Sequence, residues 1–146
     1  MTTETKTITK ADLNDKNEYA LSDDLDFNGH IVIEAELGFV RFRGSLIAKN
    51  AIIAKAGSGI KAGSGIKAGA GIEAGWGIKA GWGIKAGEGI LTGWLGLTLK
   101  DLSAKWIDAK LRIAVGFNCK EAGKINGEIR HGEVILGIVE TNKGAK

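Results

Sequence analysis

Between Gly57 and Thr92 the chain repeats a six-residue pattern of apolar, polar and glycine positions. The successive units read GSGIKA, GSGIKA, GAGIEA, GWGIKA, GWGIKA and GEGILT. In each unit the aliphatic residue and the residue two places later share one side of an extended strand, and the residue between them faces the other side. A helix is excluded because it needs apolar residues about every 3.6 positions and loses about 1 kcal/mol at each glycine. The pattern predicts three-residue strands with one buried face, separated by Gly-x-Gly corners.

Strand-and-corner units of six residues close most simply with three sides per turn. This predicts an all-β fold, a single-stranded triangular parallel β-helix with about 18 residues per turn. Residues that are 18 apart then become neighbours in adjacent turns. Inside, we expect Ile60 on Ile78, Ile66 on Ile84 and Leu102, and Ile72 on Ile90. Outside, we expect three columns, Lys49–Lys67–Lys85, Lys61–Lys79 and Lys55–Glu73, with Trp76 beneath Trp94.

The flanking segments follow the repeat less closely. In SLIAKN and AIIAKA the Ala-Lys pair keeps its place, but Ile47 and Ile53 stand one residue out of phase, so we expect larger and less regular turns there. We divide the chain into a polar N-terminal arm or cap (1–26), the β-helix (27–110, with the hexad core at 57–92) and a C-terminal β cap (111–146). In the C-terminal cap, INGEIR and GEVILGIVE predict a closing hairpin around Arg130-His131-Gly132.

The Gly-Ile-Lys-Ala hexads resemble the hexapeptide repeats of β-helical proteins, and in style they are closest to the bactofilin or polymer-forming β-helix group. The resemblance covers about residues 27–110 and implies a self-assembling structural protein. The left-handed hexapeptide acyltransferases place a small residue two positions before the aliphatic one. Here that position holds Trp76, Trp82 and Glu88 in three of the six units, which argues against that register. The acyl-transfer histidine of that family also has no counterpart in the repeat.

Composition narrows the class of protein further. The chain has 146 residues, 23 glycines, no proline and one cysteine, which fits one domain without a disulfide and excludes collagen. No segment has the length of a membrane-spanning helix or the pattern of a secretory signal, so we expect a cytoplasmic protein that does not bind membranes. Net charge is +3, but residues 1–30 carry 3 bases and 7 acids whereas residues 31–115 carry 12 bases and 6 acids.

Candidate catalytic chemistry is sparse. The glycines run G-x-G-x-x-x-G, which matches neither the dinucleotide-binding nor the P-loop spacing. Cys119 and His131 could form a thiol–imidazole pair, but no third member is recognisable, and with His30 they supply too few ligands for a zinc site. We therefore expect no enzymatic activity, no catalytic residues, no cofactor and no metal.

Surface lysines and tryptophans are the candidate binding residues. They are Lys49, Lys61, Lys67, Lys79, Lys85, Trp76, Trp82 and Trp94. Stacked like charges repel one another, and an anionic partner relieves that repulsion; the alternative is a solubilising ladder that discourages aggregation. Tryptophans at glycine-flanked corners project outward and are typical of binding sites, unless Trp76 stacks on Trp94.

These features favour a non-enzymatic binding module for a macromolecule, with a protein as the expected partner and a role as an inhibitor or adaptor. Self-assembly into dimers or filaments is the alternative. Nucleic-acid binding is the third hypothesis, since the basic rows are interleaved with tryptophan, although the overall charge is modest for it.

Overall fold

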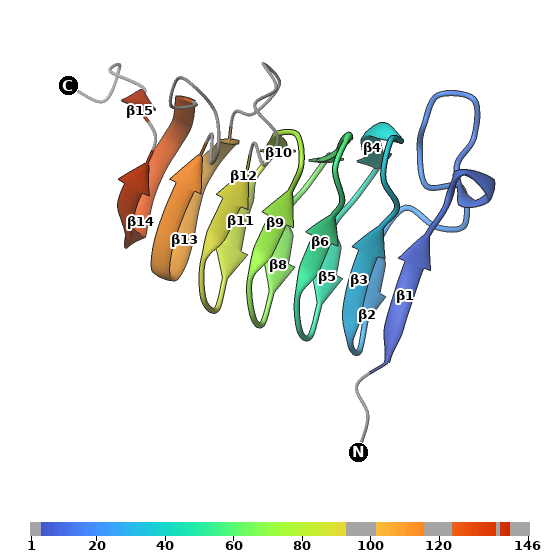
Figure 1. Ribbon diagram of the computed structural model, residues 1–146, viewed down its shortest axis with the longest axis horizontal. Coiled ribbons are helices and arrows are strands. Elements are labelled where there is room, and N and C mark those ends of the chain that lie inside the picture. Colours follow the sequence, from blue (N-terminus) through green and yellow to red (C-terminus); the bar gives the residue numbers. More distant parts are fainter. Residues whose placement is uncertain (1–3, 93–101, 116–123, 137, 141–146) are drawn as a thin grey trace.

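The computed structural model describes residues 4–92, 102–115, 124–136 and 138–140, and in this part the chain forms fifteen strands and one short 3-10 helix, η1 (Lys10–Asp12). Every strand-to-strand pairing is parallel. Figure 1 shows the turns side by side along the long axis, from β1 (Thr5–Ile8) at one end to β14 (Lys124–Leu136) at the other. The predicted all-β parallel solenoid is confirmed.

Three flat faces make up each turn. Face A contains β1, β3 (His30–Ile33), β6 (Ile52–Ala54), β9 (Ile72–Ala74) and β12 (Ile90–Thr92). Face B contains β2 (Leu25–Phe27), β5 (Leu46–Ala48), β8 (Ile66–Ala68) and β11 (Gly83–Ala86). Face C contains β4 (Gly38–Phe42), β7 (Ser58–Ala62) and β10 (Ile78–Ala80). The chain passes from A to C to B and back to A, so we name the corners A–C, C–B and B–A.

The C-terminal strands continue this winding. Strand β13 (Leu102–Val115) pairs in succession with β10, β11 and β12, so it passes along all three faces. Strand β14 runs parallel to β13, and β15 (Ile138–Glu140) runs parallel to the start of β14. The predicted hairpin is therefore wrong. Arg130-His131-Gly132 lie within β14, and the chain circles the axis once more instead of reversing.

Columns of aliphatic side chains fill the interior. The first inward position of a central strand holds isoleucine and the second holds alanine, because inward side chains recur every second residue. Ile60 stacks on Ile78, Ile66 on Ile84 and Ile72 on Ile90, as predicted. These six isoleucines are at most 2% exposed. Leu102 was placed wrongly, because it pairs with Ile78 on face C whereas Ile84 pairs with Ile107.

Residues that follow η1 pack against the first turn. Leu13 pairs with Tyr19 in an antiparallel bridge, and the ring of Tyr19, 2% exposed, lies 5.6 Å from that of Phe42. The side-chain amide of Asn17 donates hydrogen bonds of 2.7 Å to the carbonyls of Leu37 and Phe39. These contacts fix the segment over the apolar columns at this end.

Candidate binding surface

Face C carries a column of three cations. Arg41 on β4, Lys61 on β7 and Lys79 on β10 are partners in register. They occupy the outward position between two inward residues, and neighbouring strands lie about 4.8 Å apart. Glu18 forms a parallel bridge with Arg41 and so stands at the N-terminal end of the column. The predicted pairing of Lys61 with Lys79 is confirmed.

Lys61, the middle cation of this column, has a lowered pKa and contacts an aromatic ring. Burial lowers its pKa, and the neighbouring positive charges of Lys79 and Arg41 lower it further. Its Nζ lies 4.8 Å from the ring centroid of Phe39, which is a cation–π distance. The column therefore concentrates positive charge, and an anion placed over it would offset the mutual repulsion.

Face B carries a second, shorter column. Lys67 on β8 and Lys85 on β11 are partners in register, as predicted. Ile47 precedes them and Asp108 follows them in the same outward column. Lys49 does not belong to the column, because β5 and β8 are offset by 20 residues and not 18. It lies in the B–A corner, where its carbonyl faces Gly69.

The C–B corner joins these two basic faces. At this corner each turn hydrogen-bonds to the next: Gly44 N–H donates to Asp23 O, Ser64 N–H to Gly44 O, and Trp82 N–H to Ser64 O. Trp82 is 56% exposed, in agreement with its predicted outward position. Leu21, two residues before Asp23, is the other large apolar residue exposed in the part of the chain that the structure describes.

Trp76 is half-buried, which differs from the predicted outward projection. Its ring meets that of Phe39 edge-on at 5.4 Å and lies over Gly38. Its indole Nε1 is buried without a hydrogen-bond partner. Trp76 is therefore mainly part of the packing at the A–C corner. Trp94, and with it the predicted Trp76–Trp94 stack, lies outside the described residues.

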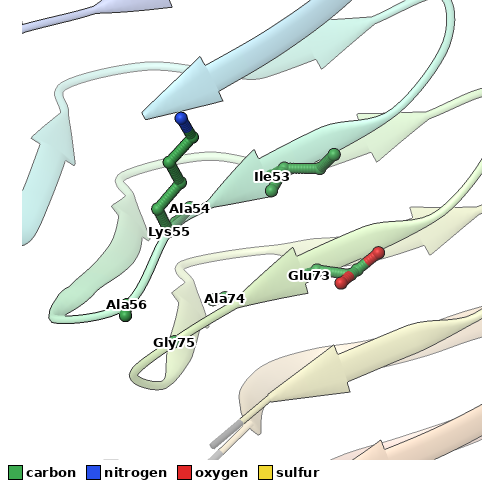
Figure 2. A pocket seen from close by; sticks show the side chains of 7 residues that line it. All are labelled: Ile53, Ala54, Lys55, Ala56, Glu73, Ala74 and Gly75. Carbon is green, nitrogen blue, oxygen red and sulfur yellow. The ribbon is translucent and has the colours of Figure 1, made fainter. Parts of the chain in front are cut away.

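Face A differs from the two basic faces. Its outward column places Val32, Ile53 and Glu73 in register, so the predicted Lys55–Glu73 column is wrong. A hollow of about 330 Å³ lies between β6 and β9, lined by Ile53, three alanines and Gly75 together with Lys55 and Glu73. Figure 2 shows Lys55 directed away from Glu73, so the two charges do not converge on one point in the hollow.

Within the described residues, the remaining candidate chemistry gives no second site. Among the residues that the structure describes, no three His, Cys, Asp or Glu side chains are grouped to hold a metal ion. No helix in that part is long and apolar enough to cross a membrane. Cys119 and the side chain of His131 lie outside the described residues, so their expected pairing stays a prediction.

Sequence reasoning missed two residues of face C: Arg41, which belongs to the cation column, and Phe39, whose ring Lys61 contacts. The signal was available in GFVRF, where Val40 and Phe42 alternate with Phe39 and Arg41. Alternation predicts that the latter two face outward. Their register with Gly59 and Lys61 could not be derived, because it depends on the length of the A–C corner.

No family model, curated protein or solved structure matched the chain in the comparisons. The fold and the surface together define a class, a three-faced parallel β-solenoid with two adjoining basic faces. The resemblance to bactofilin-like hexapeptide repeats stays a prediction.

Proposed function

We propose that this chain is a non-catalytic binding module that recognises an acidic surface of a partner protein. The contact region is the basic corner, which we define as Lys61, Lys67, Lys79, Lys85 and Trp82. The observation that carries the proposal is the charge of faces C and B in two successive turns: residues 57–68 and 75–86, which form these faces, contain the four lysines and no acidic residue. The four side chains stand in two registered pairs on adjoining faces.

Shape favours a protein over a nucleic acid. Proteins that bind single strands without sequence preference track the backbone in a positively charged groove, whereas the basic corner is a convex edge between two flat faces. A convex edge fits a groove on a partner. By occupying an acidic groove the chain would act as an inhibitor or adaptor of that partner.

Binding of labelled poly-L-glutamate, followed by fluorescence anisotropy at two salt concentrations, tests the proposal. We expect salt-sensitive binding that weakens at least tenfold when all four lysines of the basic corner are changed to glutamine. The matched control changes Lys10, Lys16, Lys49 and Lys55, all exposed and outside the basic corner, to glutamine. It alters net charge equally and should weaken binding less than twofold.

Two results contradict the proposal. One is equal weakening in both quadruple variants, which would reduce the effect to net charge. The other is the absence of any binding to polyglutamate. Tighter binding of a 20-nucleotide oligo-dT than of polyglutamate at the same salt concentration would mean that the ligand is a nucleic acid and not an acidic protein surface.

Self-assembly is the second candidate, supported by the edge of β1. In the part of the chain that the structure describes, β1 pairs with β3 alone, and an open strand edge is a template for a second copy. Lys6 opposes such stacking, since it is in register with the inward Ile31 and places a charge in the apolar column. Light scattering should therefore show larger particles for Lys6→Ile than for the wild type. A strict monomer for both would exclude assembly through this edge.

A further inference from the structure

Trp82 is the exposed aromatic residue of the basic corner. It is the central residue of Gly81-Trp82-Gly83, between β10 and β11. The corners of the two preceding turns carry Ser64 and Gly44 at the corresponding places of the hydrogen-bonded column. These residues are small, whereas Trp82 is large and 56% of it is exposed.

The four lysines are arranged around this corner with one spacing. Lys79 precedes Trp82 by three residues and Lys85 follows it by three, one on face C and the other on face B. Lys61 and Lys67 have the same relation to Ser64 in the turn before. An exposed aromatic side chain is therefore flanked by two cations on each adjoining face.

The backbone under Trp82 leaves little room for movement. A β-carbon at Gly81 would overlap the carbonyl oxygen of Gly63, and one at Gly63 would overlap that of Arg43. Trp82 N–H donates a hydrogen bond of 3.0 Å to Ser64 O. A contact residue held on a fixed backbone loses less conformational entropy on binding than one on a flexible loop.

Because Trp82 is flanked by four lysines, a complementary ligand needs two kinds of group, one apolar and one anionic. The flat indole gains most from an apolar side chain, and binding hot spots are tryptophans enclosed by contacts that exclude water. The lysines pair with carboxylates. A ligand that is acidic throughout would leave the indole uncovered, because a carboxylate placed on the apolar ring would lose its hydration.

We propose that Trp82 is the anchor of the basic corner, and that its ligand is an acidic segment of a partner protein in which one apolar side chain stands between carboxylates. The segment crosses the corner from face C to face B, with its apolar side chain on the indole and its carboxylates on the lysines at either side. This inference rests on the proposed function and adds the position and composition of the contact.

Two synthetic peptides test it by calorimetric titration. One has the sequence Gly-Glu-Glu-Leu-Glu-Glu-Gly, and the other has serine in place of the leucine. We expect the wild-type protein to bind the leucine peptide about tenfold more tightly than the serine peptide. Trp82→Ala should remove that preference while retaining binding of polyglutamate through the lysines. Trp82→Phe should restore most of the preference.

Leu21→Ala is the matched control, because Leu21 is 66% exposed and lies two residues before Asp23, whose carbonyl accepts a hydrogen bond from Gly44 of the same corner. It should leave the preference for leucine unchanged, and circular dichroism should show that both alanine variants remain folded. Loss of the preference in Leu21→Ala would overturn the inference, because the segment would then run along the corner. Equal binding of both peptides by the wild type would also overturn it. In either case retained polyglutamate binding would leave the proposed function standing, whereas loss of all acidic ligands would refute both.

Discussion

Turns before and after residue 60 differ in length although they share the same three faces. Strands β7 to β12 follow one another at 18 residues per turn, whereas β4 and β7 are offset by 20 and β3 and β6 by 21. The C–B and B–A corners keep three residues between the inward positions in both regions, as at 43–45 and 63–65. The whole difference lies in the A–C corner, which spans 34–39, then 55–59, then 75–77.

The two wide A–C corners are joined to each other by side-chain hydrogen bonds. Ser58, fully buried, donates its hydroxyl to the carbonyl of Glu34 and accepts from the N–H of Leu37. In the next turn Trp76 N–H donates to Ser58 O, and the Trp76 ring packs on Phe39. One corner can therefore change length without disturbing the other two, provided that its polar groups are satisfied.

We call the three-residue corners narrow. Those with the sequence Gly-x-Gly depend on their first glycine. A β-carbon at Gly69 would overlap the carbonyl oxygen of Lys49, whereas one at Gly71 would lie 3.5 Å from Gly89 O, an ordinary contact. Gly69→Ala should lower the free energy of unfolding by about 3 kcal/mol. Gly71→Ala should leave it unchanged or raise it by about 0.5 kcal/mol, because alanine restricts the unfolded chain. Urea denaturation of both variants measures the difference, and equal effects would refute this account of the corners.

The wide corner should be broken by removing its hydroxyl. Ser58→Ala removes the fully buried hydroxyl that is the partner of the N–H of Leu37 and the carbonyl of Glu34, and we expect a loss of about 2 kcal/mol of stability. Ser64→Ala, at an exposed position of the narrow C–B corner, should change stability by less than about 0.5 kcal/mol. Thermal unfolding followed by circular dichroism compares the two. Similar midpoints would mean that Ser58 is not what holds the wide corner.

Trp76→Phe probes the junction of the two regions with a smaller effect. The phenyl ring retains contact with Phe39, and the buried Nε1, which has no partner, is removed. These changes offset one another, so we expect the free energy of unfolding to stay within about 1 kcal/mol of the wild type. Trp76→Ala, which removes the ring as well, should cost about 3 kcal/mol. Equal losses in the two variants, measured by denaturant titration, would show that the ring contact contributes nothing.

The hexads were sufficient to predict the strands and the registers from β7 to β12, because strand and corner recur there at one fixed length. They were not sufficient for Lys49 and Lys55. Two extra residues at 55–59 shift the 18-residue spacing, so Ile47 stands next to Lys67 and Ile53 next to Glu73. Trp82 was placed correctly because its corner keeps three residues in both regions. The burial of Trp76 depends on Phe39, which lies in an irregular turn and could not be aligned from the repeat.

Lys61 links the two regions electrostatically, since it stands between Arg41 of a wide turn and Lys79 of a narrow one. Its pKa is lowered in the folded state by burial and by these two charges. Between the lowered pKa of the folded state and the ordinary pKa of 10.5, the unfolded chain therefore binds more protons than the folded one, and stability rises with pH as Lys61 loses its proton. At neutral pH the repulsion between Lys61, Arg41 and Lys79 is fully present.

Lys61→Gln should consequently raise the melting temperature slightly at pH 7 and low salt, and the gain should shrink as salt screens the charges of the column. Lys67→Gln is the control and should give a smaller gain, because the registered neighbours of Lys67 are the uncharged Ile47 and one cation, Lys85. A larger gain in melting temperature for Lys67→Gln than for Lys61→Gln, or a gain that salt does not reduce, would contradict the conclusion that charge repulsion is greatest in the face C column.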